Sequence, residues 1–419
     1  MGKAIDKRRF DNVKTIIKVN RLLQGKSQRE VCDGICTTSH LSKIEQGDTQ
    51  PSREIIVQFY KKLGLNAELD EAFIENGYDD IVIFFKEFMF NEFDVTNKRF
   101  LNLEDDEEKY MASPFVLDYL IAKMSFCSTQ NKKSYSDIKS ILSTMTKHMS
   151  KDQKYYYYLC LGVVALKGEK DLKRTEQYFT RAKSLLDCGQ INYWIGYMYL
   201  KNKQAIEASQ YAERGLRGYF KDANIVGVIS TFELLGLIYY SVSEYAAGIR
   251  QYEKALEYSR LAIHSMYEAN IKNQIAWGYM RLGNYDKSKT YLVKDRYNND
   301  NTVNSSVTKF VIAYLQKDIK TMHALKEEFS SRNRSLHRMI YSVLDRARYL
   351  DDDGKWIVED SEIDALFEFA QFTHFELEKV FCEMATTHYS GKGDYKTAFQ
   401  YAKKATDNAF RYDTHFKLK

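Results

Sequence analysis

Apolar residues recur at helical spacing along most of the chain, and the polar breaks between them are short. Near the N-terminus, Val13, Ile16 and Ile17 share one face of a helix expected over residues 10–23. Only two of the 419 residues are proline, the residue that most strongly interrupts a helix. The pattern therefore predicts an all-α protein.

The stretch from residue 27 to residue 52 contains a series of helix start and stop signals. Ser27 and Glu30 form a capping box, and Gly34 ends the short helix that follows. Thr37 or Thr38 can cap a second helix, and Gly47 ends it. Two short helices joined by a glycine-containing turn predict a helix-turn-helix, which places its second helix in the major groove of DNA.

The second helix of this motif is polar on the face that should meet DNA. Leu41 and Ile44 are expected to face the core, so short or cationic side chains remain outside, able to contact phosphates and base edges. The residues expected to contact DNA are Ser27, Gln28, Thr37, Thr38, Ser39, His40, Ser42 and Lys43. Further cations on the first helix and before it, namely Arg8, Arg9, Lys14 and Arg21, are also candidates for phosphate contact.

Charge is distributed unevenly around an overall value of +5. Residues 1–65 hold 13 Lys and Arg against 7 Asp and Glu, a net of +6 that suits a DNA-binding head. Residues 66–110 hold 4 against 14, a net of −10, which predicts an acidic helical connector or simply a solvated helix surface. Within it, the apolar run 81–90 must be buried, in a core or against a second subunit.

Residues 111–419 are predicted to form a right-handed solenoid of tetratricopeptide-like helix pairs. Small residues recur at Gly162, Gly196, Gly236 and Ala276, at intervals of 34, 40 and 40 residues. Tyrosine lies three positions after the last three of these, and a second small residue lies twelve positions after. Residues 391–405 resemble the turn and second helix of another repeat, whereas 111–150 and 295–375 are expected to be helical but degenerate.

The inner helices of such a solenoid line a concave groove. Asparagine amides can bond both groups of a peptide backbone, aromatic rings form pockets, and Lys201 or Arg281 can hold a terminal carboxylate. Counting from the small residues, the positions expected to face an extended peptide are Tyr193, Tyr197, Lys201, Glu233, Leu237, Tyr240, Asn270, Asn273, Trp277 and Arg281. For each one taken singly, an ordinary polar surface position is the alternative.

The segment ICTTSHLSKIEQG, followed by PS, resembles the repressor-type (XRE/Cro) helix-turn-helix. Ile35-Cys36 and residues 41–45 most resemble the peptide-pheromone regulators, the Rap/Rgg/NprR/PlcR/PrgX group, and the layout is closest to the NprR type. Asn20 and Lys26 depart from this pattern, since the family usually has apolar residues there. The resemblance implies a quorum-sensing transcription regulator, a homodimer switched by a short signalling peptide in the groove.

Other classes of function find little support in the sequence. Glycine-loop, hydrolase, zinc-protease and dinucleotide motifs are all absent, so neither an enzyme nor a cofactor or metal is expected. Six cysteines without metal-ligand spacing, and the lack of a signal peptide or membrane-length apolar run, predict a cytoplasmic protein with reduced thiols. The alternative to a regulator is a repeat adaptor of the Rap type, which binds a partner protein and for which DNA binding is secondary.

Overall fold

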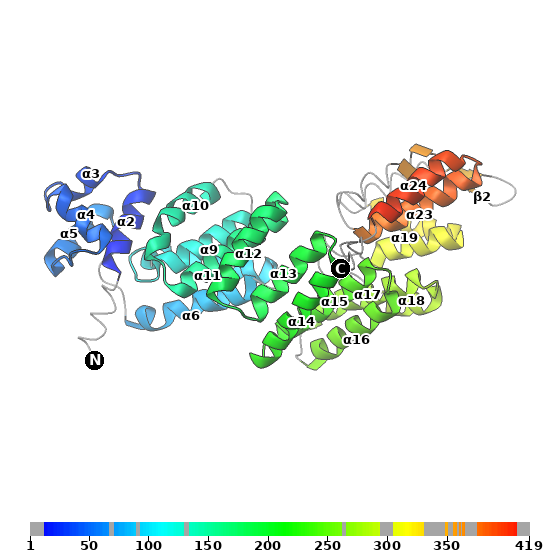
Figure 1. Ribbon diagram of the computed structural model, residues 1–419, viewed down its shortest axis with the longest axis horizontal. Coiled ribbons are helices and arrows are strands. Elements are labelled where there is room, and N and C mark those ends of the chain that lie inside the picture. Colours follow the sequence, from blue (N-terminus) through cyan, green and yellow to red (C-terminus); the bar gives the residue numbers. More distant parts are fainter. Residues whose placement is uncertain are drawn as a thin grey trace, which may run out of the picture. The chain divides into compact units, whose positions relative to one another are not determined.

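The computed structural model describes residues 12–66, 71–88, 93–129, 134–261, 265–293, 305–330, 348–350, 355–357, 360–361, 363–364 and 375–408 (Figure 1). Nearly all of these residues are helical, which confirms the predicted fold class. The chain divides into two compact units, Met1–Trp194 and Ile195–Lys419, which are described in turn. The expected boundaries at residues 65 and 110 fall inside the first unit and stay a prediction.

The helices of the first unit are α2 (Val13–Leu23), α3 (Gln28–Cys32), α4 (Thr38–Gln46), α5 (Arg53–Leu63), α6 (Glu71–Phe88), α7 (Phe93–Asp105), α8 (Glu107–Met111), α9 (Val116–Thr129), α10 (Ser134–Met145), η1 (Thr146–His148), α11 (Lys151–Val164), η2 (Ala165–Glu169) and α12 (Leu172–Leu185). Helix α13 (Gly189–Lys201) crosses from the first unit into the second. The second unit continues with α14 (Ala205–Lys221), α15 (Ile225–Ser241), α16 (Tyr245–Leu261), α17 (Ser265–Arg281), α18 (Tyr285–Tyr291), α19 (Ser305–Gln316), α20 (Ile319–Ser330), β1 (Arg348–Leu350), β2 (Lys355–Ile357), α23 (Phe375–Gly391) and α24 (Tyr395–Asn408).

Helices α2 to α5 form the head, and their ends follow the local signals in the sequence. The capping box at Ser27 and Glu30 is complete, because each side chain accepts a hydrogen bond from the backbone of the other. The Thr37 hydroxyl accepts from the backbone N–H of His40 at 3.2 Å, so Thr37 is the N-cap of α4. Gly47 ends α4 at φ +86°, a conformation that favours glycine. The predicted helix-turn-helix is confirmed.

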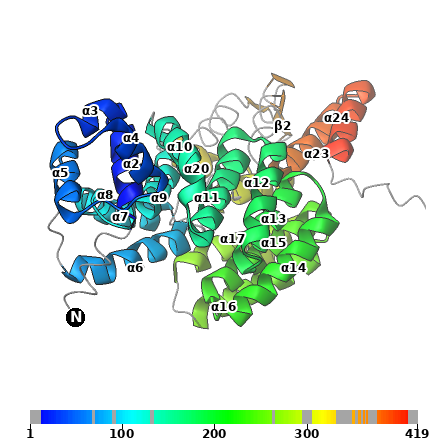
Figure 2. The same cartoon turned by 60° about the vertical axis from the view of Figure 1, so that its left-hand side comes forward.

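The head is tied to the next helices through two buried side chains. The Asn20 amide donates to the carbonyl oxygens of Ile16 at 2.8 Å and Met111 at 2.9 Å. The Tyr60 hydroxyl donates to the carbonyl oxygen of Ala112 at 3.0 Å. Asn20, which departs from the family pattern, therefore joins the head to the end of α8, close to α9 (Figure 2).

Two expectations for this unit are refined by the structure. The apolar run that begins at Ile81 packs within the unit, since Phe84 and Phe85 are buried and Phe85 stacks on Tyr156 with ring centroids 4.3 Å apart. Leu23, the last residue of the helix expected over residues 10–23, does not share its buried face and is 38% exposed.

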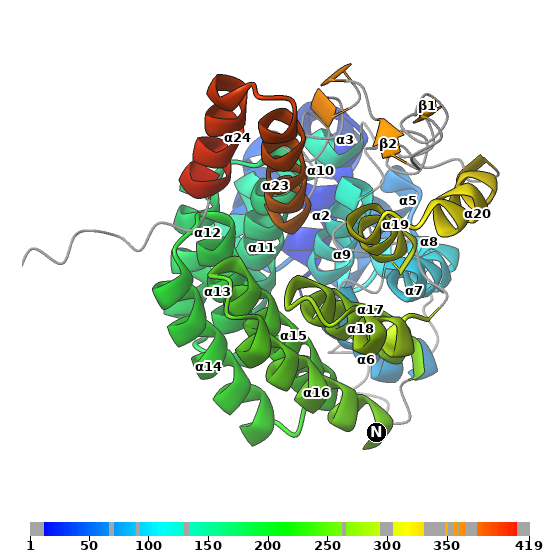
Figure 3. The same ribbon diagram turned by 90° about the vertical axis from the view of Figure 1, so that its right-hand side faces the viewer.

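Helix pairs of the predicted repeat type follow, with small residues at the close approaches. A Cβ at Gly162 of α11 would lie 2.4 Å from the Phe179 ring of α12. A Cβ at Gly196 would lie 3.1 Å from the Ala208 carbonyl oxygen. Figure 3 shows helices α14 to α18 of the second unit as packed antiparallel neighbours, and α23 and α24 form the expected pair around residues 391–405.

The expectation that residues 295–375 are entirely helical is wrong. Helices α19 and α20 form a pair, but β1 and β2 make an antiparallel ribbon in which Tyr349 lies opposite Trp356. Aromatic and β-branched residues in this segment favour extended pairing over a helix. Much of the remaining stretch lies outside the described residues.

Candidate functional site

The recognition helix α4 presents the polar face that the sequence predicted. Leu41 and Ile44 are completely buried and hold the helix on the head. Thr38, Ser39 and Lys43 are exposed, and their side chains form no hydrogen bond with another described residue. These three side chains are open to solvent and can contact a ligand.

The sequence made Arg21 a candidate for phosphate contact, but its side chain is buried in an ion pair. Its guanidinium donates to both carboxylate oxygens of Glu45, at 2.6 and 2.8 Å, and the two side chains are only 11% and 4% exposed. The Gln28 amide also donates to Glu45, at 2.9 Å. This buried cluster joins α2, α3 and α4 and so fixes the angle of the recognition helix. Contact of Gln28 with DNA stays a prediction.

The other residues expected at DNA divide between capping and surface positions. Ser27 and Thr37 use their hydroxyl oxygens as helix caps. Ser42 accepts a hydrogen bond from Gln46 at 3.4 Å. His40 is half-buried, and its Nε2 atom is buried without a hydrogen-bond partner among the described residues. The direct contacts of all these side chains with DNA stay a prediction.

On the second unit, some predicted peptide-facing residues remain accessible on the inner helices. Tyr197, Leu237 and Asn270 are half-buried, and Lys201 is exposed with its ammonium 5.4 Å from the centre of the Tyr197 ring. The Asn270 amide donates to Glu233 at 3.2 Å. Burial raises the pKa of Glu233 to about 7, while the Asn270 hydrogen bond lowers it.

Three of the expected groove residues are instead structural, because their side chains face a packed neighbour. Tyr240 is fully buried and donates its hydroxyl hydrogen to the Gln274 carbonyl oxygen at 2.9 Å. Asn273 is buried, and its side-chain oxygen accepts from the Val293 backbone N–H at 3.1 Å. Tyr193 is buried in the first unit. An open position in the groove is therefore wrong for these three side chains.

Trp277 and Arg281 contact acidic side chains of helix α23. The indole Nε1–H of Trp277 donates to the Glu376 carboxylate at 3.0 Å. The Arg281 guanidinium donates to both oxygens of Glu383, at 2.5 and 2.8 Å, and to the Tyr245 hydroxyl at 2.9 Å. In this structure Arg281 therefore binds a carboxylate of the same chain, and its binding of a peptide carboxylate stays a prediction.

Sequence reasoning missed the acidic residues of this cluster. Glu376 lies 99 residues from Trp277, and Glu383 lies 102 residues from Arg281. Glu376 is 1% exposed, and burial raises its pKa, while Arg281 opposes that rise. An acidic residue at the start of a predicted helix is common, so no signal in the sequence could have connected these positions.

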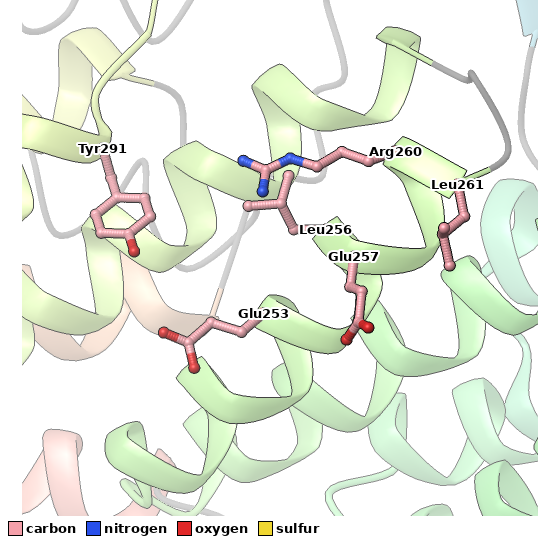
Figure 4. Close-up of a pocket in the computed structure, with 6 residues that line it drawn as sticks. All are labelled: Glu253, Leu256, Glu257, Arg260, Leu261 and Tyr291. Carbon is pink, nitrogen blue, oxygen red and sulfur yellow. The ribbon is translucent and has the colours of Figure 1, made fainter.

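A pocket of about 480 Å³ opens on the outer helices of the second unit (Figure 4). Its lining comes from α16 and from the end of α18. The residues that line it are Glu253, Leu256, Glu257, Arg260, Leu261 and Tyr291. None of them is a predicted peptide-binding residue, so this pocket is separate from the inner face.

Two further findings concern the described part of the chain. No helix there is long and apolar enough to span a membrane. No group of three or more His, Cys, Asp or Glu residues is arranged there to hold a metal ion.

Residues 17–69 match the helix-turn-helix family. The chain is 19% identical over 411 residues to the transcriptional activator NprA of Geobacillus stearothermophilus, covering 89% of this chain and 97% of that protein. The chain is thus similar to this transcriptional activator over most of its length. The family resemblance stated from the sequence is thereby confirmed.

Solved structures show the same fold. The apo form of RapI has a TM-score of 0.58 at 13% identity, with 80% of this chain and 99% of RapI covered. The apo form of the quorum sensor NprR from B. thuringiensis has a TM-score of 0.54 at 12% identity, with 80% and 99% covered. At these identities the likeness concerns the fold.

Proposed function

We propose that this protein is a quorum-sensing transcription regulator that binds duplex DNA through α3 and α4 and is switched by a short peptide bound to the repeats. The observation that carries the proposal is the recognition helix itself. A buried ion pair fixes α4 in place, while Thr38, Ser39 and Lys43 remain exposed and uncommitted. A polar helix whose orientation is set by a buried ion pair is suited to binding in the major groove of DNA.

The peptide site is proposed on the inner helices of the second unit. Tyr197, Leu237 and Asn270 offer ring, apolar and amide contacts on accessible positions. Lys201 adds a cation for a peptide carboxylate. The family likeness supports this use, since NprA is named a transcriptional activator and NprR a quorum sensor.

A homodimer is part of the proposal, because helix-turn-helix heads usually bind two half-sites about one turn of DNA apart. No catalytic residue is proposed.

The test of DNA binding is selection of bound fragments from sheared genomic DNA by the full-length protein. The matched variant carries Thr38→Ala and Lys43→Ala, two substitutions at exposed positions that leave the helix caps and the core intact. We expect one enriched sequence with the parent protein and at least a hundredfold weaker binding to it with the variant, about 3 kcal/mol. Equal enrichment with both proteins would show that α4 does not contact the DNA.

The test of peptide binding uses a mixture of random synthetic hexapeptides with free termini. Peptides retained by the full-length protein after gel filtration are identified by mass spectrometry and compared with those retained by a Tyr197→Ala, Asn270→Ala variant. We expect an enriched group of peptides that the variant loses, while both proteins keep the same melting temperature. An enriched group that the variant retains would place the site elsewhere.

A second candidate is an adaptor that binds a partner protein, favoured by the fold likeness to RapI over 80% of this chain. The DNA selection separates the two functions. A protein that folds but enriches no sequence, with or without the peptides found above, would support the adaptor.

A further inference from the structure

Three lysines and a histidine gather where the head meets the helices behind it. Lys14 and Lys18 lie one turn apart on α2, and Lys147 and His148 belong to the short helix η1. The Lys18 ammonium lies 3.5 Å from Nε2 of His148. All four residues belong to the first compact unit, in which α2 packs against α10 just before η1.

The three lysines affect the pKa of His148. Burial lowers the pKa of His148, and Lys18, Lys14 and Lys147 lower it further, in that order. Lys18 and Lys14 face the ring from α2, and Lys147 is its neighbour in η1. The three lysines thus concentrate positive charge around the ring and disfavour its protonation.

No carboxylate balances this charge within the part of the chain that the structure describes. The head's buried carboxylate, Glu45, is committed to Arg21 and Gln28. Lys14, Lys18 and Lys147 form no ion pair with any described residue, and Lys147 is exposed. Clustered charge of this kind attracts anions.

The cluster begins beside the end of the recognition helix. The Lys14 ammonium lies 2.8 Å from the point that a Cβ on Gly47 would occupy. Gly47 is the C-cap of α4, so its missing side chain leaves the room through which Lys14 crosses. The three lysines and His148 therefore run from the end of α4, along α2, to η1.

We propose that Lys14, Lys18, Lys147 and His148 form a second phosphate-binding surface, which takes the backbone of duplex DNA beside the segment that α4 reads. The proposal rests on the proposed DNA-binding function and extends it, because η1 lies outside the helix-turn-helix. Two of the four side chains come from α2 and two from η1, behind the head. Asn20 and Tyr60 join the head to residues 111–112 of the same unit.

The first experiment measures the salt dependence of DNA binding by the full-length protein. The probes are a fluorescein-labelled duplex of 30 base pairs with mixed sequence and the fragment enriched in the selection described above. Each phosphate neutralised contributes about −0.9 to the slope of log K against log salt concentration. For a Lys18→Gln, Lys147→Gln variant we expect a slope shallower by about 2 and a similar loss of affinity for both probes.

The control variant carries Lys98→Gln and Lys173→Gln, two exposed lysines of the same unit on α7 and α12. It has the same change of net charge, so we expect the parent slope. A slope shared by parent, test variant and control would overturn the second surface. The proposed function would stand in that case, provided that Thr38→Ala with Lys43→Ala still abolishes sequence-specific binding. Failure of every protein to bind either duplex would overturn both.

An acidic protein segment is the alternative partner, and polyglutamate serves as its probe. Loss of polyglutamate binding by the Lys18→Gln, Lys147→Gln variant, with DNA binding unchanged, would overturn the assignment to DNA.

His148 provides a second, independent readout. A phosphate next to the ring favours its protonated form, so DNA binding should take up a proton and strengthen as pH falls from 8 to 6. We expect the His148→Gln variant to lose that part of the pH dependence while keeping its affinity at pH 8 within about threefold. A pH profile that is identical in parent and variant would contradict the role of His148. Circular dichroism melting of each variant checks that the fold is retained.

Discussion

Buried charge at single residues does much to position the head. The Glu45 carboxylate accepts hydrogen bonds from Arg21 and Gln28, and these come from two other helices. Because the pair is almost completely removed from water, each charge depends on its partner. A single substitution here acts on the orientation of α4 although it touches no DNA.

We therefore expect Glu45→Ala to destabilise the head by about 3 kcal/mol, because the Arg21 guanidinium is left buried without its partner. Urea unfolding followed by circular dichroism gives the change. Gln46→Ala is the matched control on the same helix, and its exposed side chain predicts a change within about 0.5 kcal/mol. Similar values for the two variants would contradict the importance of the ion pair.

A second residue makes stability depend on pH. Burial raises the pKa of Glu233 from 4.5 to about 7. Its stabilising contribution as a protonated group is complete below pH 4.5 and is lost as pH rises through about 7, because the folded protein binds the proton more tightly than the unfolded chain.

Glu233→Gln removes this titration and keeps an oxygen that can accept from Asn270. At pH 8 we expect the variant to be more stable than the parent by roughly 1–3 kcal/mol, with the difference shrinking toward pH 4. Thermal melting across this range measures it. A difference that does not vary with pH would show that Glu233 does not titrate in this range.

At the scale of elements, the repeats depend on positions where two helices approach without side chains between them. A Cβ at Gly248 of α16 would lie 2.9 Å from the Gly236 carbonyl oxygen of α15 and 2.4 Å from the Tyr240 ring. The backbone atom cannot move aside without shifting α15, so the pair must separate. Small residues at these positions set the spacing of the solenoid.

Gly248→Ala should therefore destabilise the second unit by about 1–3 kcal/mol, despite the higher helix propensity of alanine. Gly391→Ala is the control, because a Cβ there meets nothing within 4 Å and alanine should be neutral or stabilise by up to about 1 kcal/mol. Thermal unfolding of both variants measures the two changes in stability. Comparable loss in the two would point to a backbone requirement for glycine rather than to close packing.

At the scale of the whole molecule, the second unit is closed by contacts between helices far apart in sequence. Helix α23 lays Glu376 and Glu383 against Trp277 and Arg281, positions expected to meet a peptide. The carboxylates of α23 occupy the donors that a peptide terminus would use. Release of α23 would make those donors available.

The exchange of backbone amides tests this closure. Glu383→Lys places a cation against Arg281, so we expect the amides of α23 and α24 to exchange about tenfold faster, with α15 and α16 unchanged. Lys396→Glu on the exposed face of α24 is the control with a charge change of the same size. Exchange in α23 that matches the control would show that the Arg281 contact does not hold the helix in place.

Local signals account for the parts of the structure that sequence reasoning predicted well. Caps and stops such as Ser27, Thr37 and Gly47 act through hydrogen bonds and backbone angles within a few residues. The 34-residue interval between Gly162 and Gly196 is the length of one helix pair of the repeat. Short-range interactions of this kind can be recognised without knowing the tertiary structure.

The parts that could not be predicted depend on long-range contacts. Arg21 has the same appearance in sequence whether it pairs with Glu45 or faces phosphate, and only the crossing of α2 over α4 decides between them. The same applies to Trp277 and Glu376, and to the ribbon of β1 and β2 within a segment expected to be helical.

The sequence by itself determined the helical fold class, the helix-turn-helix with its caps, and the repeats with their small residues, because each depends on neighbours along the chain. The tertiary structure decided which polar residues are structural, how Asn20 joins the head to residue 111, and that α23 contacts Arg281. It also brought Lys18 beside His148, 130 positions away. Burial and charge pairing join residues that are distant in sequence, so they become visible only once the chain is folded.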